Sequence, residues 1–277
     1  MVGTLEAETT ASIDFFSRCR RGFQAGGRAA GRAAVRIGRS VSSAYSAVDP
    51  DVRRHVAQWP LMGLTLLSSR RRSVEAIEDD GHRPIVFVHG LAGHPGNFLP
   101  MQKFFALKGR RRTYAVGFDS VATMQNSAGQ LSSFIEEVIR VNLLSSDASV
   151  DVVAHSMGGL VARLAVQNRA TSERVATLVT LGTPHIGTYA ARFGATQNVL
   201  DLRPGSAVMT ELLTQLPWRG PPDQPRLVAL WSPADVLLLP AEAARAAGAP
   251  AVEMSGFTHY SYLLHPQAWT RVLALLE

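Results

Sequence analysis

At residues 150–159 the chain reads VDVVAHSMGG, an apolar stretch that leads through Ser156 into small residues. A serine hydroxyl is a good nucleophile only where a base can take its proton and backbone N–H groups can reach the developing oxyanion. The sharp turn between strand and helix that creates this position is crowded two residues before and two residues after the serine. Ala154 and Gly158 are small enough to fit there. The usual pattern has glycine where this chain has Ala154, a difference of one methyl group. The segment therefore predicts a nucleophile elbow at Ser156.

Strand-length apolar runs alternate with helical stretches on both sides of this segment. The predicted strands are Pro84–Val88, Thr113–Phe118, Val150–Val153, Val175–Leu181, Arg226–Trp231 and Ala251–Met254. The predicted helices are Asn97–Leu107, Ser127–Leu144, Met157–Asn168, Gly205–Leu216, Ala241–Ala247 and Pro266–Leu276. Such alternation predicts an α/β fold, with a mostly parallel sheet of about six strands and helices on both faces. Ligands then bind at the carboxyl ends of the strands.

The chain has 277 residues, of which 46% are hydrophobic, enough for one sizeable core and an appendage. We predict an α/β catalytic domain over residues 81–277 and a basic, helical or partly disordered N-terminal arm over residues 1–80. Within the domain, residues 182–225 form a long excursion. Its apolar side chains indicate either a lid with an acyl-binding surface or ordinary core.

The net charge of +6 is concentrated in the arm, where Arg28, Arg32, Arg36 and Arg39 would form one stripe on a helix. Such a stripe is suited to a solvated arm or to peripheral contact with an anionic membrane, although bulky apolar anchors are scarce. No nucleic-acid motif accompanies the charge, so we expect no nucleic-acid partner.

Cys19 is the single cysteine, which excludes an intramolecular disulfide. No secretory signal is evident at the N-terminus. No apolar run approaches the roughly 20 residues of a spanning helix. We therefore expect a cytoplasmic protein, with membrane association through the arm as an addition.

Backbone donors for an oxyanion are expected after the first strand, which ends in His89-Gly90. The N–H groups of Leu91, in the turn that follows, and of Met157, directly after the nucleophile, would converge on a substrate carbonyl oxygen. An ordinary glycine-rich loop is the alternative interpretation.

Asp235 is the best candidate for an acid that orients the base, because it lies in a turn directly after the fifth predicted strand. Asp201 and Asp119 are competing carboxylates that fit the chain order less well. His259 follows the last predicted strand and is the candidate base, with His265 and His185 as rivals. His155, beside the serine, is expected to orient the elbow.

The order Ser156, Asp235, His259, each residue placed after a strand, is more specific than any single motif. With these residues the chain resembles the bacterial lipase and esterase branch of the α/β-hydrolase superfamily over residues 84–277. The resemblance is carried by the segments Val88–Leu91, Ala154–Gly159, Leu181–Thr188, Ser232–Asp235 and His259–Leu264.

The resemblance implies hydrolysis of carboxylic esters, probable substrates being lipids or acylglycerols, through an acyl-enzyme on Ser156. It implies no cofactor, and no metal-ligand set is identifiable. The residues expected to contribute to substrate binding are His89, Gly90, His155, Thr183, Pro184 and His185. An acyltransferase or a thioesterase with the same three catalytic residues is the nearest alternative, and a non-catalytic module that binds a lipid or a protein is another.

Overall fold

The structure is a computed structural model that describes residues 48–65, 74–119 and 122–277. The chain divides into two compact units, Met1–Pro50 and Asp51–Glu277, and the account below concerns the second. Residues 1–47 of the predicted arm, including its arginine stripe, lie outside the described residues. The arm as a separate region of residues 1–80 stays a prediction.

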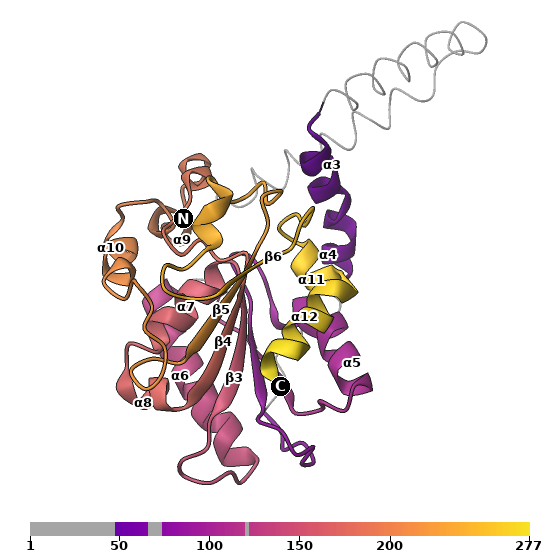
Figure 1. Cartoon of the computed structure of the whole chain (residues 1–277), viewed down its shortest axis with the longest axis vertical. Coiled ribbons are helices and arrows are strands. Elements are labelled where there is room, and N and C mark those ends of the chain that lie inside the picture. The colour runs from indigo at the N-terminus through magenta and orange to yellow at the C-terminus, as the bar shows by residue number, and fades with distance from the viewer. Residues whose placement is uncertain (1–47, 66–73, 120–121) are drawn as a thin grey trace, which may run out of the picture. The chain divides into compact units, whose positions relative to one another are not determined.

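The described part of the second unit is built on one sheet of six parallel strands (Figure 1). Their bounds are β1 Ile85–Val88, β2 Thr113–Val116, β3 Val150–His155, β4 Val175–Leu181, β5 Arg226–Trp231 and β6 Ala251–Glu253. Their order is β2-β1-β3-β4-β5-β6, and every neighbouring pair is parallel. The predicted α/β fold with a parallel sheet is thus confirmed.

The strand order reverses at β1. From β1 the chain moves outward to β2, and it then crosses back to place β3 on the other side of β1. Where the order of a parallel sheet reverses, the loops after the two adjacent strands diverge and leave a crevice at their carboxyl ends. The loops after β1 and β3 carry the predicted oxyanion residues and Ser156, so the topology brings these two segments together.

Helices cover both faces of the sheet (Figure 1). One face packs against α6 (Met124–Val141), α7 (Met157–Ala165) and α10 (Ala207–Leu213), with β3 contributing Val152 and Ala154 to this core. The other face packs against α5 (Leu99–Leu107), α11 (Ser261–Leu264) and α12 (Pro266–Leu276), with β3 contributing Val153. Because successive strand residues point to opposite faces, a strand buried on both sides is apolar along most of its length.

Helix α6 illustrates how local sequence sets an element. Leu131, Ile135 and Val138 recur at helical spacing and are all buried. The side chain of Thr123 caps the N-terminus by accepting a hydrogen bond from the backbone N–H of Asn126 (3.2 Å). The helix therefore starts three residues before the predicted Ser127, and it ends at Val141.

Several short elements differ from the prediction. The predicted helix Ala241–Ala247 is a single 3₁₀ turn, η4 (Ala241–Ala244), because the chain leaves helical geometry at Arg245. The structure adds five short helices that the sequence did not predict: η2 (Pro95–Phe98), α8 (Arg169–Glu173), η3 (Tyr189–Phe193), α9 (Gln197–Asp201) and α11. Helices α3 (Pro50–Ala57) and α4 (Trp59–Thr65) precede the sheet.

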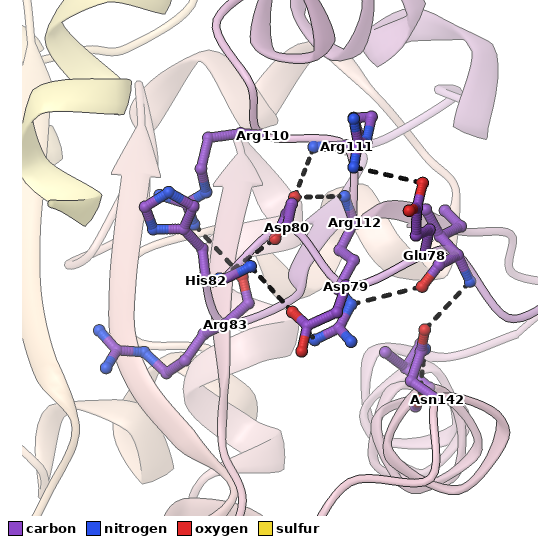
Figure 2. A network of polar contacts seen from close by, with 12 residues as sticks. Glu78, Asp79, Asp80, His82, Arg83, Arg110, Arg111, Arg112 and Asn142 are labelled. Atoms are coloured by element: carbon purple, nitrogen blue, oxygen red, sulfur yellow. Dashed lines mark hydrogen bonds and ion pairs between the residues drawn. The ribbon is translucent and has the colours of Figure 1, made fainter.

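The amino ends of β1 and β2 are joined by a polar network (Figure 2). One carboxylate oxygen of Asp80 accepts hydrogen bonds from the backbone N–H groups of Arg111 (2.6 Å) and Arg112 (3.0 Å). The Arg112 guanidinium lies 3.1 Å from the carboxylate of Asp79. Burial alone would raise the pKa of Asp80, but the backbone N–H groups of Arg112, Arg111 and His82 together lower it. The segment before β1 is thereby tied to the segment before β2.

A second carboxylate, Asp151 of β3, is buried beside this network. Its oxygens lie 3.2 Å from Nε of Arg83 and 3.8 Å from a guanidinium nitrogen of Arg110. Burial raises the pKa of Asp151, and the two arginines oppose that effect. The two carboxylates at this end of the sheet are therefore held by arginines and backbone donors.

Candidate active site

Ser156 stands at the turn between β3 and α7 in a backbone conformation that side chains rarely adopt, with φ 55° and ψ −129°. Such a conformation costs about 1–3 kcal/mol and persists only where surrounding contacts enforce it. Here the backbone N–H of Ser156 donates to the carbonyl of Leu181 at the end of β4 (2.9 Å), and the hydroxyl of Thr183 donates to the carbonyl of Ser156 (2.9 Å). The predicted elbow geometry is present.

Glycines beside the serine are required by close approach. A Cβ at Gly158 would lie 2.5 Å from the carbonyl oxygens of Val88 and His89, and a Cβ at Gly159 would lie 2.1 Å from the hydroxyl oxygen of Thr183. The start of α7 can therefore lie directly against the loop after β1 and the loop after β4 only because both positions lack side chains.

A continuous chain of hydrogen bonds joins the three residues predicted to do the chemistry. Nε2 of His259 lies 2.9 Å from Oγ of Ser156. Nδ1 of the same ring lies 3.0 and 2.9 Å from the two carboxylate oxygens of Asp235. A carboxylate only accepts, so Nδ1 carries the proton and Nε2 is left to accept from the serine hydroxyl. The structure thus brings Ser156, His259 and Asp235 together from three separate loops.

The rival residues lie elsewhere. Asp201 accepts a hydrogen bond from Gln197 (2.7 Å), and Asp119 accepts one from Gln130 (3.0 Å). The ring of His265 caps α12 by accepting from the backbone N–H of Gln267.

Two further histidines border the serine and its base. His155 is buried, and its Nε2–H donates to the carbonyl of His259 (2.9 Å). Burial, with the charge of His259 as a second cause, lowers the pKa of His155 well below its ordinary value, so the ring is neutral at pH 7. The Nδ1–H of His89 donates to the carbonyl of Gly90 (3.0 Å). His155 therefore holds the backbone of His259, and His89 orders the loop after β1.

Thr183 and His185, which the sequence analysis assigned to substrate binding, are fully buried and do not line the cavity described below. The ring of His185 bonds to the Thr180 hydroxyl (3.0 Å), and its carbonyl accepts from the guanidinium of Arg163 (2.9 Å). Burial lowers the pKa of Arg163 to about 10 and, together with that cation, lowers the pKa of His185 well below its ordinary value. Both residues support the loop behind Ser156 because packing directs them inward.

A cavity of about 410 Å³ opens over the serine. Of the predicted site residues, Ser156, His259, His89, Gly90, Leu91, His155 and Pro184 line it. Most of its remaining wall is apolar and includes Phe98, Val199, Leu202, Leu238 and Leu263. Its surface is suited to an apolar group joined to a small polar centre.

The 182–225 excursion divides between the two expected uses. Val208, Met209, Leu212 and Trp218 are buried in the core under the sheet. Val199 and Leu202 line the cavity. The excursion therefore supplies core and part of the cavity wall.

Met62 and Gly63 of α4, and Tyr260 beside the base, also line the cavity, and none was predicted as a site residue. The only local signal in α4 is an apolar run, which does not say where the helix packs. The hydroxyl of Thr65 accepts from the side chain of Asn97 (2.8 Å), which holds the end of α4 against η2.

Among residues 48–65, 74–119 and 122–277, no group of three or more His, Cys, Asp or Glu side chains is arranged to hold a metal ion. In the same residues no helix combines the length and the apolar character needed to cross a bilayer.

The comparisons with known proteins agree with this geometry. The family model described as palmitoyl protein thioesterase matches residues 84–220. A triacylglycerol lipase of Burkholderia plantarii is 25% identical over 150 residues, or 51% of this chain and 40% of its own length. A triacylglycerol lipase of Pseudarthrobacter phenanthrenivorans is 26% identical over 129 residues, or 44% of this chain and 38% of its own. The chain thus matches about two fifths of the length of these relatives.

Solved structures share the fold. The mature form of a Bacillus licheniformis lipase aligns with a TM-score of 0.61 at 19% identity, covering 74% of this chain and 96% of that one. Aspergillus fumigatus lipase B aligns with a TM-score of 0.59 at 16% identity, covering 76% and 56%. With its parallel sheet and its elbow after β3, the chain is a lipase-like α/β-hydrolase.

Proposed function

We propose that this protein is a serine hydrolase that cleaves carboxylic esters, with lipid or acylglycerol esters as its substrate class. One observation carries the proposal. The hydrogen-bonded chain from Asp235 through His259 to Ser156 ends at a strained serine that faces an apolar cavity. The names of the similar proteins, two triacylglycerol lipases and a thioesterase family, support the same chemistry.

In the proposed reaction, Oγ of Ser156 attacks the ester carbonyl carbon while Nε2 of His259 accepts the hydroxyl proton. The tetrahedral intermediate collapses to an acyl-enzyme, and the alcohol leaves with the proton from His259. A water molecule then attacks the acyl carbonyl, gives its proton to His259, and releases the acid as Ser156 takes the proton back. Asp235 keeps the imidazole oriented and stabilises its cationic form.

The N–H groups of Leu91 and Met157 are the proposed oxyanion donors. Neither has a hydrogen-bond acceptor within the described part of the chain, so both are available to a substrate. Gly90 leaves the approach open, since a Cβ there would lie 2.8 Å from Cβ of Ser156. Loss of one such donor typically costs about 2.7–4 kcal/mol of transition-state stabilisation.

Thioester cleavage is the second candidate, and the match of residues 84–220 to the palmitoyl protein thioesterase family favours it. A thioester presents the same acyl carbonyl to Ser156 and differs in its leaving group. Hydrolysis rates on palmitoyl-CoA and on p-nitrophenyl palmitate, measured under the same conditions, separate the two.

The arginine stripe of the N-terminal arm is proposed to contact anionic lipid. Co-sedimentation with vesicles of phosphatidylglycerol, compared with vesicles of phosphatidylcholine, tests this. Equal sedimentation with both, or with neither, would exclude charge-driven binding.

The central experiment measures hydrolysis of p-nitrophenyl esters from acetate to palmitate by the wild type and by Ser156→Ala. We expect turnover in the wild type and a loss of about 10⁵-fold or more in the variant. A fluorophosphonate should label the wild type on Ser156 and leave the variant unlabelled. Labelling without hydrolysis of any ester would move the proposal to the thioesterase or to an acyltransferase, whereas unlabelled wild type would refute a serine mechanism.

A further inference from the structure

The loop that carries the proposed base, residues 254–260, receives side chains from a distant part of the chain. Helix α3 and the residue after it, Gln58, belong to the region that precedes the sheet by more than twenty residues. Arg54 of α3 donates through its guanidinium to the carbonyl of Gly256 (2.9 Å). The ring of His55 stacks on Tyr260, with centroids 5.0 Å apart and an interplanar angle of 16°.

Gln58 makes the most specific of these contacts. Its carbonyl oxygen Oε1 accepts from the hydroxyl of Thr258 (2.9 Å), and its amide nitrogen donates to the hydroxyl oxygen of Ser261 (2.8 Å). Thr258 is the residue directly before His259, and Ser261 is two residues after it. Both side chains are buried. One amide thus bridges the two sides of the proposed base.

The bridge is completed within the loop itself. The backbone N–H of Thr258 donates to the hydroxyl oxygen of Ser261 (3.0 Å). The amide of Gln58, the hydroxyl of Thr258 and the hydroxyl of Ser261 therefore form a closed set in which each group has a partner. A buried set of this kind is rigid, because removing one member leaves the others unsatisfied.

We infer that Gln58 is a positioning residue that holds His259 in line between Asp235 and Ser156. The inference rests on the proposed function. Gln58 acts through the backbone of residues 258–261 and does not touch the reacting atoms. Its effect arises because proton transfer between Ser156 and His259 requires a separation near the observed 2.9 Å, and a small displacement of the ring lengthens that path.

The test replaces the amide while keeping the shape of the side chain, in Gln58→Met. Gln102→Met is the matched control, because Gln102 is also partly buried and its amide donates to the carbonyl of Thr113 at the start of β2, far from the cavity. With a p-nitrophenyl ester, we expect kcat of Gln58→Met to fall about 10-fold with KM within twofold of the wild type. The control should keep both constants.

A readout independent of turnover follows the Nδ1–H of His259. In the wild type this proton is shielded by Asp235 and should give a downfield proton NMR signal. In Gln58→Met the signal should broaden or disappear through exchange with water, while the Gln102→Met spectrum keeps it. Loss of kcat with an unchanged signal, or equal losses in the two variants, would overturn the inference.

Ser261→Ala supplies a second route should Gln58→Met fold poorly. It removes the other end of the same hydrogen bond, so the double variant should lose little more kcat than either single variant. Fully multiplicative losses would refute the bridge. Fluorophosphonate labelling keeps this test separate from the proposed function. A wild type that is labelled only when Ser156 is present upholds the serine mechanism whatever Gln58 does, whereas an unlabelled wild type rejects the mechanism itself.

Discussion

The two ends of the sheet both hold buried carboxylates, but they pair them with different partners. At the carboxyl ends, Asp235 bonds to the imidazole of His259, which can take up and release a proton near neutral pH. At the amino ends, Asp80 and Asp151 face backbone N–H groups and arginines, which do not release protons in this range (Figure 2). A buried, partnered carboxylate therefore does not mark an active site by itself. The partner's chemistry and the groups beyond it make the difference.

The two ends also differ in how the backbone is treated. At the carboxyl ends a strained serine, a pair of glycines without room for a Cβ, and unpaired N–H groups lie within a few residues of one another. At the amino ends the backbone donors of Arg111 and Arg112 are satisfied by Asp80. One end is built for rigidity, and the other holds strain and open donors that a substrate can use.

The largest expected effect comes from removing the charge of one carboxylate at each end. Asp235→Asn should lower kcat by about 10⁴-fold, because an amide at this position favours the wrong tautomer of His259. Asp151→Asn is the matched control and should leave kcat within about threefold of the wild type while lowering the free energy of unfolding by about 1–3 kcal/mol, since it weakens the pairing of Arg110. Ester kinetics and urea unfolding on both variants provide the check. Equal losses of kcat in the two would remove the distinction between the ends.

A methyl group at Gly158 tests the crowding at the elbow. Gly158→Ala should lower kcat/KM by about 100-fold, because the new Cβ would displace the loop that carries Leu91. Gly129→Ala in α6 is the control, since a Cβ there meets nothing within 4 Å, and it should stabilise the helix by up to about 1 kcal/mol. Ester kinetics and thermal unfolding of the pair measure both effects. Normal activity in Gly158→Ala would mean that the close approach has no catalytic importance.

The buried histidines at the carboxyl ends should make stability depend on pH. The pKa values of His155 and His185 are lowered well below 6.5 in the folded state, so the unfolded chain binds more protons as the pH falls. The stabilisation is complete above pH 6.5 and decreases below it, by up to about 1.4 kcal/mol per pH unit for each histidine.

Urea unfolding at pH 7 and pH 5 measures this dependence. His185→Gln should flatten the slope relative to the wild type, and His82→Gln, at an exposed position beside the opposite network, should leave it unchanged. An unaltered slope in His185→Gln would show that this ring does not carry the dependence.

The smallest effect is expected at Asp80. Asp80→Asn should lower the free energy of unfolding at pH 7 by about 1 kcal/mol, because the carboxylate is the better acceptor for two backbone N–H groups. The pKa of Asp80 is lowered in the folded state, so its contribution is present above the unfolded value of 3.8 and disappears as the pH falls through the folded value. The variant and the wild type should therefore converge in stability at low pH, with kcat unchanged at pH 7. A gap that persists in acid would assign the effect to something other than the charge.

Local patterns in the sequence were enough for the sheet and the nucleophile. Apolar runs bounded by polar turns identified all six strands to within two residues at each end, because strands buried on both faces leave an uninterrupted signal. The small residues around Ser156 identified the elbow, because a crowded turn restricts side-chain size at fixed positions. The chain order of Ser156, Asp235 and His259 then followed from their places after strands.

Contacts between residues far apart in the chain were decided by the tertiary structure. Thr183 and His185 carry polar groups suited to a site, yet packing turns them inward toward Ser156's backbone and Arg163. Gln58 lies in a region with no recognisable motif, yet it bridges the residues on either side of His259, 200 positions away from Thr258. A side chain's type and its local pattern limit what chemistry it can perform, but its direction is set by the packing of elements that meet only when the chain has folded.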